Sequence, residues 1–154
     1  MERVDCIIRT VCSLVVGAML AAASTAGIAQ ASGPGKNFVI RATAKTPDAV
    51  VFDIKSYVLD RKWLYLAEFK VKNNEVTIVK LCVPSAASDI WAAGLHVSAL
   101  LPCGHIGVYR EGGMTRLSML DPRFMHLLNP DPNLKKAGDD LYPVLTQMLD
   151  EVVK

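Results

Sequence analysis

Two cysteines and a histidine form the cluster in this sequence whose residue types could carry chemistry. Cys103 and His105 stand two positions apart, so a thiolate and an imidazole could converge from one loop, and Cys82 could supply a third ligand. Sulfur and nitrogen ligands together suit copper, zinc or a haem iron. Cys82, Cys103 and His105 are therefore the candidate metal ligands. Further candidates follow downstream at spacings that match no known metal signature: Met114, Met119, Met125 and His126.

The same two cysteines have a simpler interpretation. A pair of cysteines in an oxidising compartment favours a disulfide. A bond between Cys82 and Cys103 would close a loop of about 22 residues, worth about 3 kcal/mol in the loop-entropy model. Buried thiols without a disulfide are a third alternative. The disulfide is the favoured interpretation and metal ligation the least favoured, so no cofactor is predicted, with copper, zinc or haem as the alternatives.

The sequence carries no motif of a known catalytic centre. It lacks a nucleophile elbow, a phosphate-binding glycine loop and a zinc-protease helix. Asp53 and Asp60 stand seven positions apart on one side of a predicted helix, but that is its solvent side and gives no reason for a paired-carboxylate role. We predict no catalytic residue, and the sequence favours a non-enzyme over an enzyme.

The first 31 residues have the three-part pattern of a secretory signal peptide. Basic residues precede an apolar run over 11–23, and Ala29 and Ala31 provide the small side chains that signal peptidase accepts. We expect the domain to be periplasmic or secreted, with an uncleaved membrane anchor as the alternative. The expected parts of the chain are a signal peptide over 1–31, a flexible leader over 32–36 and a single domain over 37–154.

The charge pattern argues against nucleic acid as a partner. The chain has 17 basic and 15 acidic residues and a formal net charge of +2, and the basic residues are scattered among acidic ones. A protein that follows a phosphate backbone instead gathers its lysines and arginines in a patch. A membrane is expected as a partner only if the signal segment is kept.

The remaining patterns predict an α+β domain. Thr46 and Pro47 are typical of a helix cap and first position, and apolar residues follow at three- and four-residue steps. Asparagine and glycine turns between β-branched runs predict two hairpins. The predicted order is β-α-β4-α, with an antiparallel sheet covered on one face by helices. The predicted elements are a strand over 38–42, a helix over 47–61, strands over 64–71 and 76–83, a short helix over 85–93 capped by Ser85, strands over 107–110 and 115–119, a rigid loop over 129–132, and a last helix over 139–153 with Pro143 in its first turn.

Several motifs resemble the domain-of-unknown-function 302 family. They are a strand ending in Cys82-Val83-Pro84, Leu101-Pro102-Cys103 before the next strand, Val108-Tyr109 and Gly112-Gly113 in a hairpin, and Asp121-Pro122 after it. The resemblance covers most of residues 38–128. It implies a TATA-binding-protein-like β-α-β4-α fold, a homodimer and no established activity. Val83 stands where family members usually have Asn.

These observations favour a non-catalytic binding module. It would hold a small ligand or a partner protein in the concavity between the curved sheet and the last helix. The alternative is a periplasmic metal, haem or thiol-redox accessory protein that uses Cys82, Cys103 and His105. In a third hypothesis the function belongs to a structural homodimer.

Overall fold

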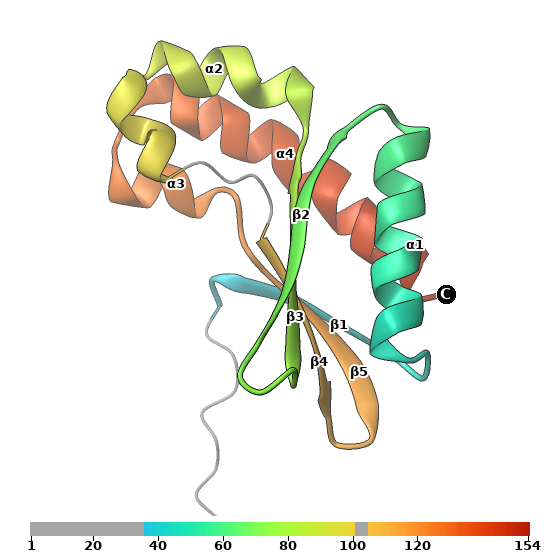
Figure 1. The fold of residues 1–154 in the computed structure, drawn as a ribbon. Coiled ribbons are helices and arrows are strands. Elements are labelled where there is room, and N and C mark those ends of the chain that lie inside the picture. Colours follow the sequence, from blue (N-terminus) through green and yellow to red (C-terminus); the bar gives the residue numbers. More distant parts are fainter. Residues whose placement is uncertain (1–35, 101–104) are drawn as a thin grey trace, which may run out of the picture. The chain divides into compact units, whose positions relative to one another are not determined.

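The computed structural model describes residues 36–100 and 105–154, which fall within one compact unit, Ser32–Lys154. Figure 1 shows the elements along the chain. In order, they are β1 (Phe38–Thr43), α1 (Pro47–Asp60), β2 (Leu64–Val71), β3 (Val76–Cys82), the short 3-10 helix η1 (Pro84–Ala86), α2 (Ala87–Ala92), a second 3-10 helix η2 (Leu95–Leu100), β4 (His105–Glu111), β5 (Met114–Leu120), α3 (Phe124–Leu128) and α4 (Pro132–Val152).

The described strands form one antiparallel sheet in the order β1-β5-β4-β3-β2. Two hairpins supply four of these strands, and β1 joins the sheet by pairing with β5, which lies late in the sequence. The register of the β2–β3 pair shifts between Tyr65 and Ala67, which marks a bulge in the edge strand β2. The predicted α+β class and antiparallel sheet are confirmed.

Local sequence signals account for the first helix and the second hairpin. The Thr46 side chain accepts a hydrogen bond from the backbone N–H of Ala49 at 3.3 Å, and Pro47 occupies the first helical position. Gly112 and Gly113 both have positive φ, 58° and 79°, which is what the tight turn between β4 and β5 requires. Both predictions are therefore confirmed.

The last helix begins seven residues before its predicted start at Asp139. The Asp131 side chain accepts hydrogen bonds from the backbone N–H groups of Asn133, at 2.7 Å, and Leu134, at 3.4 Å. Pro132 then takes the first helical position, so the supposed rigid loop over 129–132 is in part a helix cap. Consequently Pro143 lies inside α4 and not in its first turn. The short helix α3 before it was not predicted.

The predicted cap at Ser85 is also wrong. The segment after β3 opens with η1, in which Ser85 is the middle residue, and α2 follows without a side-chain cap. Pro84 sets the start of η1, so Ser85 already lies inside the first turn and is too late to cap it. The predicted end of this short helix is confirmed, because Gly94 follows α2 with a φ of 110°.

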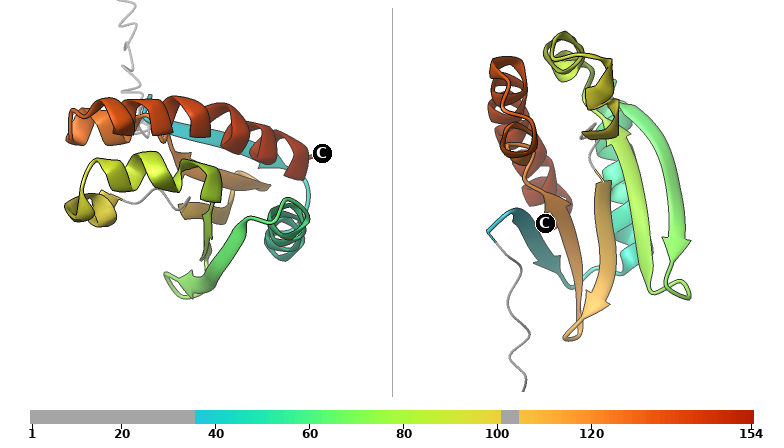
Figure 2. Two further views of the ribbon diagram at one scale, coloured as in Figure 1. Left: turned by 90° about the horizontal axis from the view of Figure 1, so that it is seen from above. Right: turned by 90° about the vertical axis from the view of Figure 1, so that its left-hand side faces the viewer.

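The core lies between one face of the sheet and the helices. Side chains of β3, β4 and β5 that alternate along each strand are fully buried, together with apolar residues of α1 and α4. Helix α4 contacts β1, whereas α1 contacts β2, β3 and β4, and the two helices also contact each other (Figure 2). No helix in the described ranges is both long and apolar enough to cross a membrane.

Gly138 allows α4 to pass close to the chain that leads into α3. A Cβ atom at this position would lie 2.8 Å from Cα of Arg123 and 3.0 Å from the carbonyl oxygen of Pro122. Both neighbours are backbone atoms, which cannot rotate away. The same segment is fixed by Asp121, whose carboxylate accepts a hydrogen bond from the backbone N–H of Arg123 at 2.9 Å.

We therefore predict that Gly138→Ala destabilises the protein by about 1–3 kcal/mol, although alanine is the better helix former by about 1 kcal/mol. The measurement is the free energy of unfolding in urea. Gly107→Ala is the matched control, because an added Cβ there would meet the Oγ atom of Ser118 at 3.1 Å, a side-chain atom that can move. Equal stability of Gly138→Ala and wild type would contradict the close contact.

Candidate binding site between helices α1 and α4

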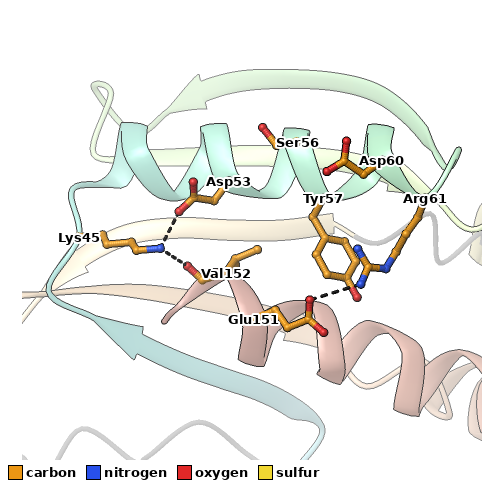
Figure 3. Close-up of a pocket in the computed structure, with 8 residues that line it drawn as sticks. All are labelled: Lys45, Asp53, Ser56, Tyr57, Asp60, Arg61, Glu151 and Val152. Carbon is orange, nitrogen blue, oxygen red and sulfur yellow. Dashed lines mark hydrogen bonds and ion pairs between the residues drawn. The ribbon is translucent and has the colours of Figure 1, made fainter.

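A polar groove of about 380 Å³ opens between α1 and the last turn of α4 (Figure 3). Helix α1 contributes one flank, because Asp53, Tyr57 and Asp60 recur at steps of four and three residues. The last turn of α4 contributes the other flank. The lining residues are Lys45, Asp53, Ser56, Tyr57, Asp60, Arg61, Glu151 and Val152.

The C-terminal end of α4 concentrates negative charge. The helix dipole places partial negative charge on its last carbonyls, and Asp150 and Glu151 add two carboxylates without any basic residue in the last turn. Cations from other elements therefore come to this end. Arg41 of β1 forms an ion pair and a hydrogen bond with Asp150, and this contact lowers the pKa of the Asp150 carboxyl.

Two more cations complete this arrangement and mark the two ends of the groove (Figure 3). Lys45 Nζ donates to the carbonyl oxygen of Val152 at 3.0 Å and to the carboxylate of Asp53 at 2.7 Å. At the other end, an Arg61 Nη atom lies 3.3 Å from a carboxylate oxygen of Glu151. The two bridges join α1, and the loop before it, to the end of α4.

Tyr57 lies beside the Arg61–Glu151 bridge (Figure 3) and is 8% exposed. The guanidinium carbon of Arg61 stands 3.4 Å from its ring centroid, and the ring of Trp63 meets it edge-on at 5.7 Å. The pKa of the Tyr57 hydroxyl is raised, chiefly by burial. Arg61 acts in the opposite direction and Glu151 in the same direction as burial. The hydroxyl is open to the groove and forms no hydrogen bond with another residue in the described part of the chain.

The opposite face of the sheet is a second candidate surface. Cross-strand pairing aligns Ile40, Ser118, Gly107, Ile78 and Phe69 in one row across all five strands. Large apolar side chains on this face are about half exposed: Phe38 at 51%, Leu64 at 51%, Phe69 at 48% and Leu120 at 44%. The face is therefore open and carries exposed apolar side chains together with polar ones such as Lys80 and Arg116.

The structure places two of the three predicted metal ligands near one end of that face. Cys82 ends β3 and is half-buried, while His105 begins β4, is exposed and pairs with Lys80. Burial and the nearby Lys80 lower the pKa of His105. Cys103 lies outside the described residues, so both the metal set and the Cys82–Cys103 disulfide remain predictions. Within the described ranges, no group of three His, Cys, Asp or Glu side chains could hold a metal ion.

The further candidate metal ligands downstream in the sequence lie in the core, next to a helix cap and at the start of a strand. Met119 and Met125 are buried in the core, at 2% and 4% exposure. The ring Nδ1 of His126 lies 3.0 Å from the carbonyl oxygen of Asp131, next to the cap of α4. Met114 begins β5 and is 37% exposed.

Comparison with known proteins identifies the family. The model of the family described as domain of unknown function DUF302 matches residues 41–152. The chain belongs to the DUF302 family. The fold of a DUF302 protein is also known: the crystal structure of an uncharacterised conserved DUF302 protein from Bacillus stearothermophilus superposes with a TM-score of 0.68 at 20% identity, covering 77% of this chain and 99% of that one. No curated protein matches the sequence.

In this DUF302 chain the predicted concavity between the sheet and the last helix is filled. The apolar face of α4, including Leu141, Leu145 and Met148, is buried in the same core as the sheet. The polar groove described above lies instead beside α4, between it and α1. Sequence reasoning placed Asp53 and Asp60 on the solvent side of α1 and missed the groove, because its other flank is supplied by residues about 90 to 107 positions away.

We predict that Lys45→Met destabilises the DUF302 domain by about 1–2 kcal/mol, because it removes charged hydrogen bonds to Asp53 and to the end of α4. The measurement is the free energy of unfolding in urea. Lys135→Met is the control, since Lys135 pairs with Asp139 on the exposed side of α4 and such pairs contribute about 0.5 kcal/mol or less. An equal decrease in the free energy of unfolding in the two variants would show that the Lys45 bridge stabilises the domain no more than an exposed ion pair does.

Proposed function

We propose that this protein is a non-catalytic binding module that acts outside the cytoplasm and holds a small ligand in the groove between α1 and α4. The observation that carries the proposal is the Tyr57 hydroxyl, which borders the groove on a side chain that is otherwise buried. Because the hydroxyl is open to the groove, a hydrogen-bond partner can reach it from there. A ligand in the groove would supply that partner.

The surroundings of Tyr57 support binding by a preorganised site. Arg61 stacks on the ring and Trp63 packs at its edge, so the phenol has little rotational freedom. Lys45 and Arg61 are each held by a carboxylate, which fixes their remaining N–H groups as oriented donors. Residues that are fixed before the ligand arrives lose little entropy on binding.

The size of the groove fits a small molecule better than a peptide. Its volume of about 380 Å³ lies at the lower end of the range for small-molecule sites, about 300–1,000 Å³. Its lining combines one aromatic face with charged groups from two helices. Such a lining selects ligands by polar contacts rather than by apolar burial.

The first test is a native mass spectrum of the protein, purified without refolding from a bacterial periplasm. We predict that wild type retains a small molecule and that Tyr57→Phe loses it, since the variant removes only the hydroxyl. Tyr109→Phe is the matched control, because Tyr109 lies in β4 on the other face of the sheet. Wild type without a bound molecule, or equal retention in Tyr57→Phe, would contradict the proposal.

The same spectrum addresses the predictions that fall outside the described residues. Cleavage after Ala31 and a mass lower by two hydrogens would support export and the Cys82–Cys103 disulfide. A retained metal or haem would instead support the alternative accessory protein that uses Cys82, Cys103 and His105.

A second candidate function, assembly as a homodimer, is favoured by the open face of the sheet. Five strands with an average of seven residues give a surface on the order of 500 Å² in projection, which approaches the roughly 800 Å² per partner of a standard interface. Its centre carries small side chains, because Gly107 and Ser118 stand side by side in the central row. A face with exposed apolar side chains and an open centre can meet a second copy of itself about a two-fold axis.

Phe69→Lys tests this assembly, because it places a charge in the apolar row. We predict that sedimentation at micromolar concentration gives a dimer for wild type and a monomer for the variant. Phe52→Lys is the control, since Phe52 is 68% exposed on the outer side of α1. A monomeric wild type would contradict the dimer.

A further inference from the structure

We infer that the groove between α1 and α4 binds a small cation that carries a primary amino group. This inference rests on the proposed function and adds the chemical class of the ligand. It is drawn from the charges that line the groove, from the ends of the two helices, and from the acceptor atoms that the internal bridges leave over.

The side chains that line the groove carry more negative than positive charge. Three carboxylates line the groove, those of Asp53, Asp60 and Glu151, against the two cations Lys45 and Arg61. Lys45 is paired with Asp53 and Arg61 with Glu151, so the negative charge of Asp60 is left over. Asp60 has no ion pair with any residue that the structure describes, and the groove therefore carries a formal charge of −1.

The helix ends add to this negative field. Asp60 is the last residue of α1, and Glu151 and Val152 belong to the last turn of α4, so both helices present their carboxyl ends to the groove. The partial negative charge at a helix C-terminus favours cations. A bound anion would be repelled by the unpaired carboxylate and by the partial negative charge at both helix ends.

Several acceptor atoms are left over beside the N–H groups of Arg61 and Lys45. One carboxylate oxygen of Asp53 remains after Lys45 binds the other, and both oxygens of Asp60 remain as well. Tyr57, which is 8% exposed as a whole residue, adds its hydroxyl oxygen at the Arg61–Glu151 end of the groove (Figure 3). An ammonium group has three N–H donors and no acceptor, so it matches such a set.

The competing possibility, an anionic ligand, would have to use the remaining N–H groups of Arg61 and Lys45. Each of these cations already faces a carboxylate, which neutralises its attraction for a second anion. A ligand with a primary amine at one end and a polar group at the other could use Asp60 for the ammonium and Arg61 for the polar end.

The test is an NMR titration of the full folded protein with three four-carbon probes: butane-1,4-diamine, butane-1,4-diol and succinate. We predict that the diamine shifts the backbone amide signals of Tyr57, Asp60 and Arg61 in a saturable way and that the diol and succinate do not. Asp60→Asn should weaken diamine binding about tenfold through loss of the carboxylate charge. Asp48→Asn, at the exposed start of the same helix and outside the groove, should change it less than about twofold.

The outcomes separate the two proposals. Binding of succinate instead of the diamine, or equal diamine affinity in Asp60→Asn and wild type, would overturn the cationic ligand. If the periplasmic protein still retained a molecule that Tyr57→Phe loses, the binding function would stand with a ligand of another class. Absence of any saturable shift with all three probes, together with no retained molecule, would overturn both.

Discussion

The carboxyl end of α4 is the constraint on which this structure depends. Negative charge gathers at this end, from the helix dipole and from the carboxylates of Asp150 and Glu151. The same helix also packs against the sheet. Three cations meet that charge from three separate places: Arg41 in β1, Lys45 in the following loop and Arg61 at the end of α1. The N-terminal strand and helix are thereby joined to the C-terminal helix.

These ion pairs also shape the groove. Because the side chains of Lys45 and Arg61 reach across from the α1 side to α4, they mark its two ends, and Tyr57 lies at the Arg61 end. Burial of apolar residues supplies most of the stability of such a domain, and the ion pairs add specificity in how α1 and α4 are placed. The helices thus form a polar surface, while the other face of the sheet stays open and carries exposed apolar side chains. A ligand and a second copy could then be bound on different faces of one domain.

The sequence predicts the elements that depend on neighbouring residues and misses those that depend on distant ones. The Thr46 cap and the Gly112–Gly113 turn are local signals, and both elements formed as expected. The start of α4 was placed too late because Asn129 to Pro132 contains two prolines, which suggest a loop, although Asp131 and Pro132 together form a helix cap. The bridge from Lys45 to Val152 spans 107 positions, and no pattern along the chain indicates it.

The candidate site residues show the same contrast between local signals and contacts with distant parts of the chain. Cys82 and His105 were selected for their residue types, and the structure places them on neighbouring strands, with Cys103 outside the described residues. Tyr57 lies on the face of α1 whose three- and four-residue spacing predicted the helix, and the residue is buried there. The position of its hydroxyl became visible only when α4 was in place, since the groove exists only between the two helices.

The most direct test of this account is a high-resolution crystal structure of the protein purified from a bacterial periplasm. The account predicts electron density for a small molecule in the groove, within hydrogen-bond distance of the Tyr57 hydroxyl and beside the Asp60 carboxylate. A Tyr57 hydroxyl bonded directly to Glu151, with only water in the groove, would contradict it and would leave the ion pairs at the end of α4 with a purely structural role.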